Sequence, residues 1–220
     1  MPYFDVMCKV TFFFSIAETA FGRNAYFPYF CYIMNDKLID IREASVSDAA
    51  FVADCVFCAI GLYDFDVRPE EYCRFAEVCR MEDTLYSYRN ALIVSVDGVD
   101  AGCIVAYPGD NYKEVREKTF KAIESKCGTK ISMNSDMETG PGEYYLDSLA
   151  VVPSFRGHGL GHVLMKAQIE RGRNLGYSRL SLIVDKTHPR VRAYYCELGF
   201  RDEGEVVFAD IAFDRMVLDF

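Results

Sequence analysis

One stretch of the sequence, residues 151–164 (VVPSFRGHGLGHVL), constrains the fold more than any other. Three alternate glycines, Gly157, Gly159 and Gly161, follow an apolar run and precede an amphipathic one. A strand that passes through a glycine-rich turn into a helix presents unpaired backbone N–H groups at the positive end of the helix dipole. The stretch therefore predicts an anion site, most simply for phosphate, in a fold that contains both strands and helices.

The spacing of these glycines distinguishes between classes of phosphate loop. A P-loop requires Gly-Lys-Ser/Thr, whereas His162 and Val163 follow Gly161 here, so that class is excluded. A dinucleotide-binding turn requires G-x-G-x-x-G directly after its strand, but this chain has G-x-G-x-G and four intervening residues, 153–156. A glycine loop with a purely structural role is the remaining alternative, although three glycines at a helix start cost conformational entropy.

Hydrophobic periodicity and turn signals predict the other elements. We expect strands at 38–44, 91–98, 100–108, 143–152 and 179–185, and a closing hairpin at 205–220. We expect helices at 47–60, 69–80, 111–126, 160–175 and 189–198. Strands and helices interleaved in this way indicate a mixed α/β or α+β sheet with helices on both faces.

Composition narrows the function classes. The 220 residues carry 33 acidic against 24 basic side chains, a net charge of −9, and no basic stripe. The acidic net charge argues against a nucleic-acid partner. It either favours a cationic small molecule as ligand or only keeps the protein soluble. Nine cysteines lie mostly in apolar segments, which indicates a reducing compartment, and Cys55-x-x-Cys58 reads as part of one helix rather than a redox or metal motif. We therefore expect a cytoplasmic protein. We also expect no bound metal, since the three histidines include no HExxH pair.

The first 38 residues differ from the rest. Residues 1–33 are rich in aromatic side chains without a period, and Met34 begins a segment that reads like an ordinary domain start. We expect an N-terminal extension over 1–38, either a misplaced start before Met34 or an added packed element, and one domain over 39–220. A signal or membrane segment is the rival reading, but Glu18 and Arg23 interrupt the apolar run, so no membrane span is expected.

Two motifs connect the chain with a known family. The sequence LAVVPSFRGHGLGHVLM (149–165) resembles the acyl-CoA-binding signature of the GNAT superfamily of N-acetyltransferases, and AYYCELGF (193–200) resembles that family's second signature. The resemblance follows the element order over 39–220 and is specific over about 143–200. It implies a GNAT-like fold, a mostly antiparallel twisted sheet of six to seven strands with helices on both faces, and acetyl-CoA as cosubstrate.

The resemblance also implies which residues contact acetyl-CoA. The strand at Leu149, Ala150 and Val151 would separate from its neighbour and bind the pantetheine arm, and a backbone N–H near Val151 would stabilise the oxyanion. His188 stands where family members often carry an asparagine that contacts the same arm. The loop that would hold the pyrophosphate consists of Arg156, Gly157, His158, Gly159, Leu160 and Gly161.

Candidate catalytic residues follow from the chemistry of amine attack on a thioester. Tyr195 falls at the position where the family often keeps its general acid, with Tyr194 as the expected core ring. Strict alternation along the strand places Asp147 on the same face as Leu149 and Val151, where it would hold the amine or act through water. An acidic segment could line the acceptor pocket or be a solvated loop: Asp64, Asp66, Glu70 and Glu71.

The sequence thus predicts an N-acetyltransferase that transfers an acetyl group to a primary amine by direct attack in a ternary complex. The acceptor is open, with a cationic amine favoured by the net charge. A non-catalytic acyl-CoA sensor and an acyltransferase with a longer acyl donor are the alternatives. The long segment 108–142 could shape the acceptor site or a homodimer interface.

Overall fold

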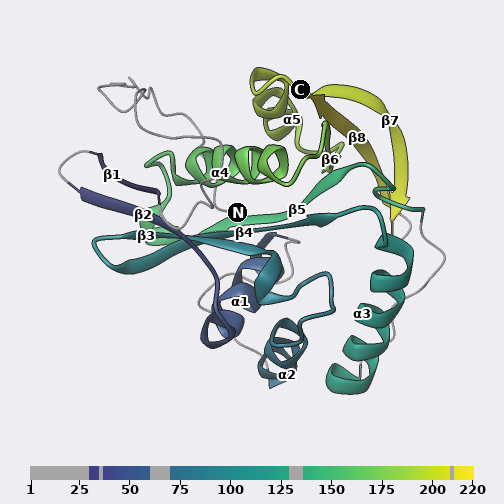
Figure 1. Ribbon diagram of the computed structural model, residues 1–220, viewed down its shortest axis with the longest axis horizontal. Helices are drawn as coiled ribbons and strands as arrows, with labels where there is room; N and C mark the ends of the chain where they lie inside the picture. The colour runs from purple at the N-terminus through teal and green to yellow at the C-terminus, as the bar shows by residue number, and fades with distance from the viewer. Residues whose placement is uncertain (1–29, 35–36, 60–69, 129–135, 209–210) are drawn as a thin grey trace.

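The computed structural model describes residues 30–34, 37–59, 70–128, 136–208 and 211–220. One eight-stranded sheet has the order β1-β2-β3-β4-β5-β6-β8-β7 (Figure 1). Its strands are β1 (Phe30–Met34), β2 (Lys37–Glu43), β3 (Ala91–Val96), β4 (Val99–Pro108), β5 (Tyr144–Val151), β6 (Arg179–Asp185), β7 (Arg201–Phe208) and β8 (Ile211–Asp219). The helices are α1 (Ala49–Ala59), α2 (Glu70–Cys79), α3 (Tyr112–Cys127), α4 (Leu160–Asn174) and α5 (Pro189–Glu197).

All neighbouring strands are antiparallel except β5 and β6, which are parallel. The predicted fold class, a mostly antiparallel sheet with helices on both faces, is confirmed. Seven strands lie within 37–219, and β1 adds an eighth at the edge by pairing with β2. Part of the predicted extension therefore continues the sheet, while residues 1–29 lie outside the described residues and the domain boundary stays a prediction.

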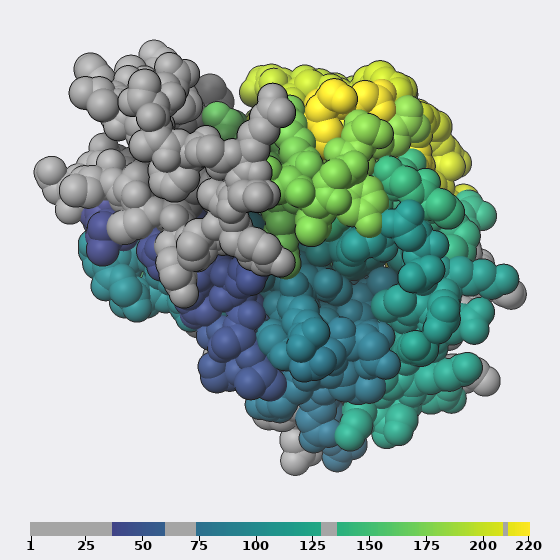
Figure 2. Space-filling view, viewed as in Figure 1, coloured from purple at the N-terminus to yellow at the C-terminus, as the bar shows by residue number. Residues whose placement is uncertain are grey.

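Two apolar clusters hold the helices to opposite faces of the sheet. Helices α1, α2 and α3 pack on one face around Val52, Phe75 and Phe120, and α4 packs on the other around Leu164 and Met165. Figure 2 shows the same division on the surface, with residues 37–128 in blue to teal below and α4 onward in green to yellow above. The central strands β3, β4 and β5 are buried between both layers, which fixes their positions on both sides.

Local sequence explains where the elements begin and end. Asp97 and Gly98 have positive φ values, 51° and 80°, and form the tight turn between β3 and β4 that the sequence predicts. Ser45 and Asp48 form a reciprocal capping box just before α1. Gly176 ends α4 with φ at 90°, as expected for a left-handed cap. Across the described residues, no helix has the length and apolar character that a membrane crossing needs.

Candidate active site

The glycine loop lies directly between β5 and α4. Gly157 and Gly159 adopt positive φ values of 79° and 74°, and α4 begins at Leu160. The first backbone bonds of the helix run from His162 and Val163 to the carbonyl of Gly159. Within the described chain, no acceptor takes the N–H groups of residues 157–161. Five consecutive donors at a helix N-terminus form an anion site, and the residues present fit a diphosphate.

Two side chains of this loop turn back onto the protein. The Arg156 Nε donates to the Val151 carbonyl at 2.9 Å, and its guanidinium also reaches the Cys58 Sγ at 3.6 Å. The His158 Nδ1 lies 3.3 Å from the Phe155 carbonyl, and the ring is exposed. Arg156 therefore ties the loop to the end of β5 and to α1, and it contributes positive charge beside the free N–H groups.

Strands β5 and β6 separate after two residue pairs. Only Tyr144 with Leu180 and Tyr145 with Ser181 are in register. On its other edge, β5 stays paired with β4 as far as Val151. The edge of β5 over residues 146–151 therefore has no strand partner among the described residues, and it includes Leu149, Ala150 and Val151. An open strand edge offers backbone N–H and carbonyl groups to an extended ligand.

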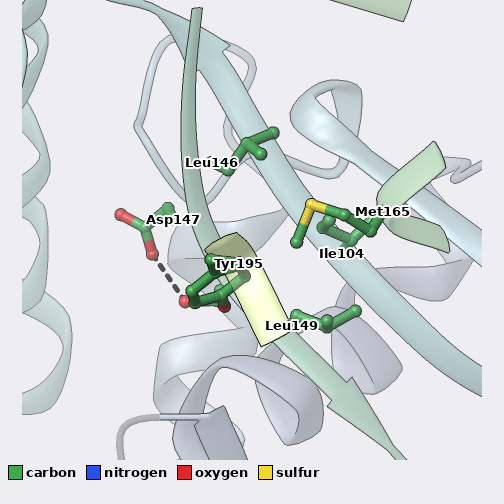
Figure 3. A pocket seen from close by; sticks show the side chains of 7 residues that line it. Ile104, Leu146, Asp147, Leu149, Met165 and Tyr195 are labelled. Atoms are coloured by element: carbon green, nitrogen blue, oxygen red, sulfur yellow. Dashed lines mark hydrogen bonds between the residues drawn. The ribbon is translucent and has the colours of Figure 1, made fainter. Parts of the chain in front are cut away.

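A bulge in β5 corrects one expectation. The register with β4 shifts between Val105, opposite Ser148, and Ala106, opposite Leu146, so Asp147 is an extra residue. Beyond it, Leu149 and Val151 pack on the α4 side. The expectation that Asp147 shares their face is wrong, because a bulge interrupts the alternation of side chains. Figure 3 shows Asp147 pointing away from Leu146 and Leu149.

The Asp147 carboxylate lies in a network of hydroxyl groups on the α1–α3 side. It accepts hydrogen bonds from the Tyr107 hydroxyl and the Ser148 hydroxyl, both at 2.5 Å. Burial and the nearby Glu138 carboxylate raise the pKa of Asp147 to about 6, although the two hydroxyl donors oppose the shift. A carboxyl with this pKa is largely ionised at neutral pH and is a better base than an ordinary aspartate.

A second buried carboxylate belongs to the same network. Glu138, 8% exposed, accepts from the hydroxyls of Tyr112 and Tyr145, each at 2.6 Å. The Tyr107 ring lies 5.5 Å from the Tyr145 ring and 6.1 Å from the Tyr112 ring, centroid to centroid. One tyrosine thus bonds Asp147 and two bond Glu138, and the three rings lie beside one another; the segment 108–142 contributes Tyr112 and Glu138. The sequence did not predict Glu138 or these tyrosines, since no local motif marks them.

Tyr195 lies over a small pocket beside the open edge of β5. The pocket measures about 200 Å³, its open mouth included. Burial raises the pKa of Tyr195 to about 12, so the hydroxyl is protonated at neutral pH. Within the described chain its hydroxyl has no hydrogen-bond partner, whereas the Tyr194 hydroxyl lies 3.2 Å from the His162 Nδ1. The pocket is lined by Ile104, Leu146, Asp147, Ser148, Leu149, Met165 and Tyr195 (Figure 3).

The remaining candidates divide into two groups. His188 precedes α5 as its N-cap residue, is exposed, and lies 3.1 Å from the Thr187 hydroxyl rather than in the pocket lining. Asp64 and Asp66, and the side chains of Glu70 and Glu71, lie outside the described residues. The pocket residues Ile104, Leu146 and Met165 were not predicted, because their apolar side chains carry only the signal of an ordinary core.

Comparison with known proteins places the chain in a family. The sequence model described as "Acetyltransferase (GNAT) family" matches residues 62–200, more than half of the chain. This chain belongs to the GNAT acetyltransferase family. Acetyl transfer in this family is acetyl-CoA-dependent, and the free N–H groups of the loop and the open edge of β5 fit that cosubstrate. No curated protein sequence matches the chain.

Solved structures support the same conclusion. One structure, titled "The crystal structure of acetyltransferase", is 27% identical, with a TM-score of 0.67, and the match covers 81% of this chain and 98% of that one. An N-acetyltransferase from Staphylococcus aureus Mu50 is 22% identical, with a TM-score of 0.64 and coverages of 81% and 99%. Ard1 from Thermoplasma volcanium is 17% identical, with a TM-score of 0.52 and coverages of 82% and 97%. The last two resemble this chain in fold.

Proposed function

We propose that this GNAT acetyltransferase is an N-acetyltransferase that moves the acetyl group to a primary amine by direct attack in a ternary complex. The observation that carries the proposal is the separation of β5 from β6 after Tyr145. Along the open edge, the chain runs from the pocket under Tyr195 to the free N–H groups of the glycine loop. One continuous surface of β5 can therefore hold the donor from its acyl end to its diphosphate.

The donor would be held by backbone groups. The N–H groups of residues 157–161 bind the diphosphate, and Arg156 keeps the loop against β5 and adds charge. The open edge at Leu149, Ala150 and Val151 binds the pantetheine arm as an added strand would. A backbone N–H of this open edge beside the pocket stabilises the oxyanion that develops on the thioester carbonyl. His188 is exposed beside the start of α5, where it contacts the arm through its ring N–H.

Proton transfer would use residues on the two sides of β5. Tyr195 donates its hydroxyl proton to the departing thiolate, since its pKa of about 12 keeps it protonated. Asp147 faces the opposite side, where its ionised carboxylate attracts an ammonium group and a water accepts the amine proton on its way to the carboxylate. The acceptor approaches from that side, and the acidic balance of the chain favours a small cationic amine.

The first test is ligand binding by the full chain. Acetyl-CoA at 100 times its dissociation constant stabilises a folded protein by about 2.7 kcal/mol, which raises the melting temperature by several degrees. NADH and ATP at the same concentrations serve as controls. A shift with NADH or ATP in place of acetyl-CoA would contradict the assignment of the glycine loop.

The second test separates an enzyme from an acyl-CoA sensor. A screen of primary amines, read by release of free thiol from acetyl-CoA, identifies the acceptor. Tyr195→Phe should then lower kcat by about 10²-fold or more, because a general acid contributes that much, and leave acetyl-CoA affinity unchanged. Tyr194→Phe is the matched control, with near-normal turnover expected. Equal turnover in the two variants would remove Tyr195 from the mechanism.

A further inference from the structure

The pocket under Tyr195 has one wall that the proposed mechanism does not use. Four apolar side chains form it: Ile104 from β4, Leu146 and Leu149 from β5, and Met165 from α4. Ile104 and Met165 are each 1% exposed. Asp147, Ser148 and Tyr195 also line the pocket, but the Asp147 carboxylate points to the opposite side of β5. The pocket therefore has one apolar end and one polar end beside the Tyr195 hydroxyl.

The apolar wall lies where β5 first loses its partner. Tyr145 makes the last pair with β6, and Leu146 begins the open edge. A thioester that binds along this edge, with its diphosphate at the glycine loop beyond Val151, reaches the pocket with its acyl group. The apolar wall is therefore placed to contact the acyl chain and not the amine, since Asp147 points to the opposite side of β5 (Figure 3).

Met165 closes this wall from the helix side. In Figure 3 its thioether end points from α4 toward β5 and Tyr195. Met165 lies on the same helix as Leu160 and Gly161, the last two residues of the glycine loop, because α4 begins at Leu160 and Met165 follows about one and a half turns later. The distance between the bound diphosphate and the end of the pocket is thus set within a single helix. The strand residues Ile104 and Leu146 are fixed by the sheet and form the sides.

We propose that the wall of Ile104, Leu146, Leu149 and Met165 is the acyl-binding site of the donor, and that Met165 limits the acyl chain to two or three carbons. This inference rests on the proposed function, since it requires the thioester to lie along the open edge of β5. A longer chain meets the buried Met165 side chain, and inserting atoms into a packed interior is unfavourable. The residue therefore determines donor specificity without taking part in proton transfer.

The experiment measures equilibrium binding of CoA thioesters to the full chain, with no acceptor present. Acetyl-, propionyl-, butyryl- and hexanoyl-CoA are compared with CoA itself by calorimetry. The wild type should bind acetyl- or propionyl-CoA most tightly and hexanoyl-CoA at least tenfold more weakly. Met165→Ala removes three heavy atoms, so butyryl-CoA should become the tightest ligand. Each methylene newly buried should raise affinity about fourfold, equivalent to about 0.8 kcal/mol.

Met216→Ala is the matched control. Met216 lies on β8, is 0% exposed, belongs to the same apolar cluster as Met165 and does not line the pocket. The same atoms are deleted from an equally buried site, so both variants lose packing, but Met216→Ala should keep the wild-type order of affinities. If Met165→Ala does not fold, Met165→Val makes a smaller opening and should shift the preference by one carbon.

Each result bears on a definite statement. A wild-type preference for hexanoyl-CoA, an unchanged order in the folded Met165 variant, or the same change in both methionine variants would overturn the role of Met165. Failure of the wild type to bind CoA itself would instead contradict the proposed function. CoA carries the diphosphate and the pantetheine arm but no acyl group, so its binding does not depend on the role of Met165. The two failures are therefore distinguishable in one set of titrations.

Discussion

The two ends of β5 are built in opposite ways. At its start, Glu143 accepts hydrogen bonds from the Arg215 guanidinium at 2.5 and 2.6 Å, from the Ser181 hydroxyl at 2.8 Å and from the Thr139 hydroxyl at 2.9 Å. These contacts hold β5 to β6 and β8 where the strands pair. Toward its other end, β5 has no partner on the β6 side within the described chain. One end satisfies a buried charge internally, and the other leaves backbone groups for a ligand.

This difference indicates how the fold maintains an open strand edge. Unsatisfied backbone groups favour closure of the gap by pairing of β5 with β6. The bulge at Asp147 opposes that closure, because a bulge bends its strand and interrupts regular pairing, while the Glu143 contacts hold β5 to β6 at the paired end. Burial alone would raise the pKa of Glu143, but the donors from Arg215, Ser181 and Thr139 lower it, so the carboxylate is ionised at neutral pH.

The largest loss of stability is expected from a change at the closed end of β5, where Glu143 holds the strand to β6 and β8. Arg215→Met leaves the Glu143 carboxylate buried beside two hydroxyls without its charge partner. Loss of one member of a buried ion pair typically costs 3–5 kcal/mol, so the free energy of unfolding should fall by about 3 kcal/mol in urea titrations. Adding Glu143→Gln should recover part of this loss, because the unpaired charge is removed. A loss in the single variant below about 1 kcal/mol would show that the pair does not hold the strands.

The second prediction concerns Asp147 and pH. The folded-state pKa of about 6 lies above the ordinary value of 3.8, so the folded protein binds more protons than the unfolded chain between pH 4 and 6. The contribution of Asp147 to the free energy of unfolding is therefore fully present below pH 4 and is lost as the pH rises through 6. At 1.36 kcal/mol per pKa unit the loss is below about 3 kcal/mol.

Asp147→Asn should remove that part of the pH dependence. As pH rises from 4.5 to 7, the free energy of unfolding should increase more, or decrease less, in the variant than in the wild type. The comparison with the wild type is needed because other groups titrate in the opposite sense; the pKa of Asp48, for example, is lowered to about 2 by the Arg42 and Ser45 donors against the effect of burial. Identical pH profiles would mean that Asp147 is not perturbed in the folded state.

Asp147 also illustrates where prediction from sequence succeeds and fails. The element order and the strand-loop-helix around Gly157 follow from local patterns, and they are confirmed. The bulge at Asp147 is not local, because it is defined by the register between β5 and β4, some 40 residues apart. The Glu143–Arg215 pair could not be predicted for the same reason, because its members are 72 residues apart in sequence. Only packing of the whole sheet reveals such pairs.

The third prediction tests the open end of β5, where the strand leads into the glycine loop. It compares Gly157 in that loop with Gly176, a glycine of similar backbone conformation at the far end of α4. Gly157 and Gly176 have φ values of 79° and 90°, and among the described residues no non-neighbouring atom lies within 4 Å of a Cβ added at either position. Alanine at each site should cost about 1 kcal/mol of stability, because left-handed backbone is unfavourable for residues with a Cβ. Only Gly157→Ala should also weaken acetyl-CoA binding, since its new methyl group lies beside the diphosphate. Equal affinities in the two variants would remove Gly157 from the proposed donor site.

The smallest effect is expected from the exposed ion pairs around the closed end. Arg201 is 53% exposed and bridges to Asp219 at 2.6 Å and to Glu203 at 3.6 Å. Exposed pairs contribute about 0–1 kcal/mol, because water screens the charges and the side chains lose freedom. Arg201→Ala should therefore lower the free energy of unfolding by less than 1 kcal/mol and leave acetyl-CoA affinity unchanged. A loss as large as that of Arg215→Met would mean that the exposed ion pairs stabilise this end of the sheet as much as the buried pair does.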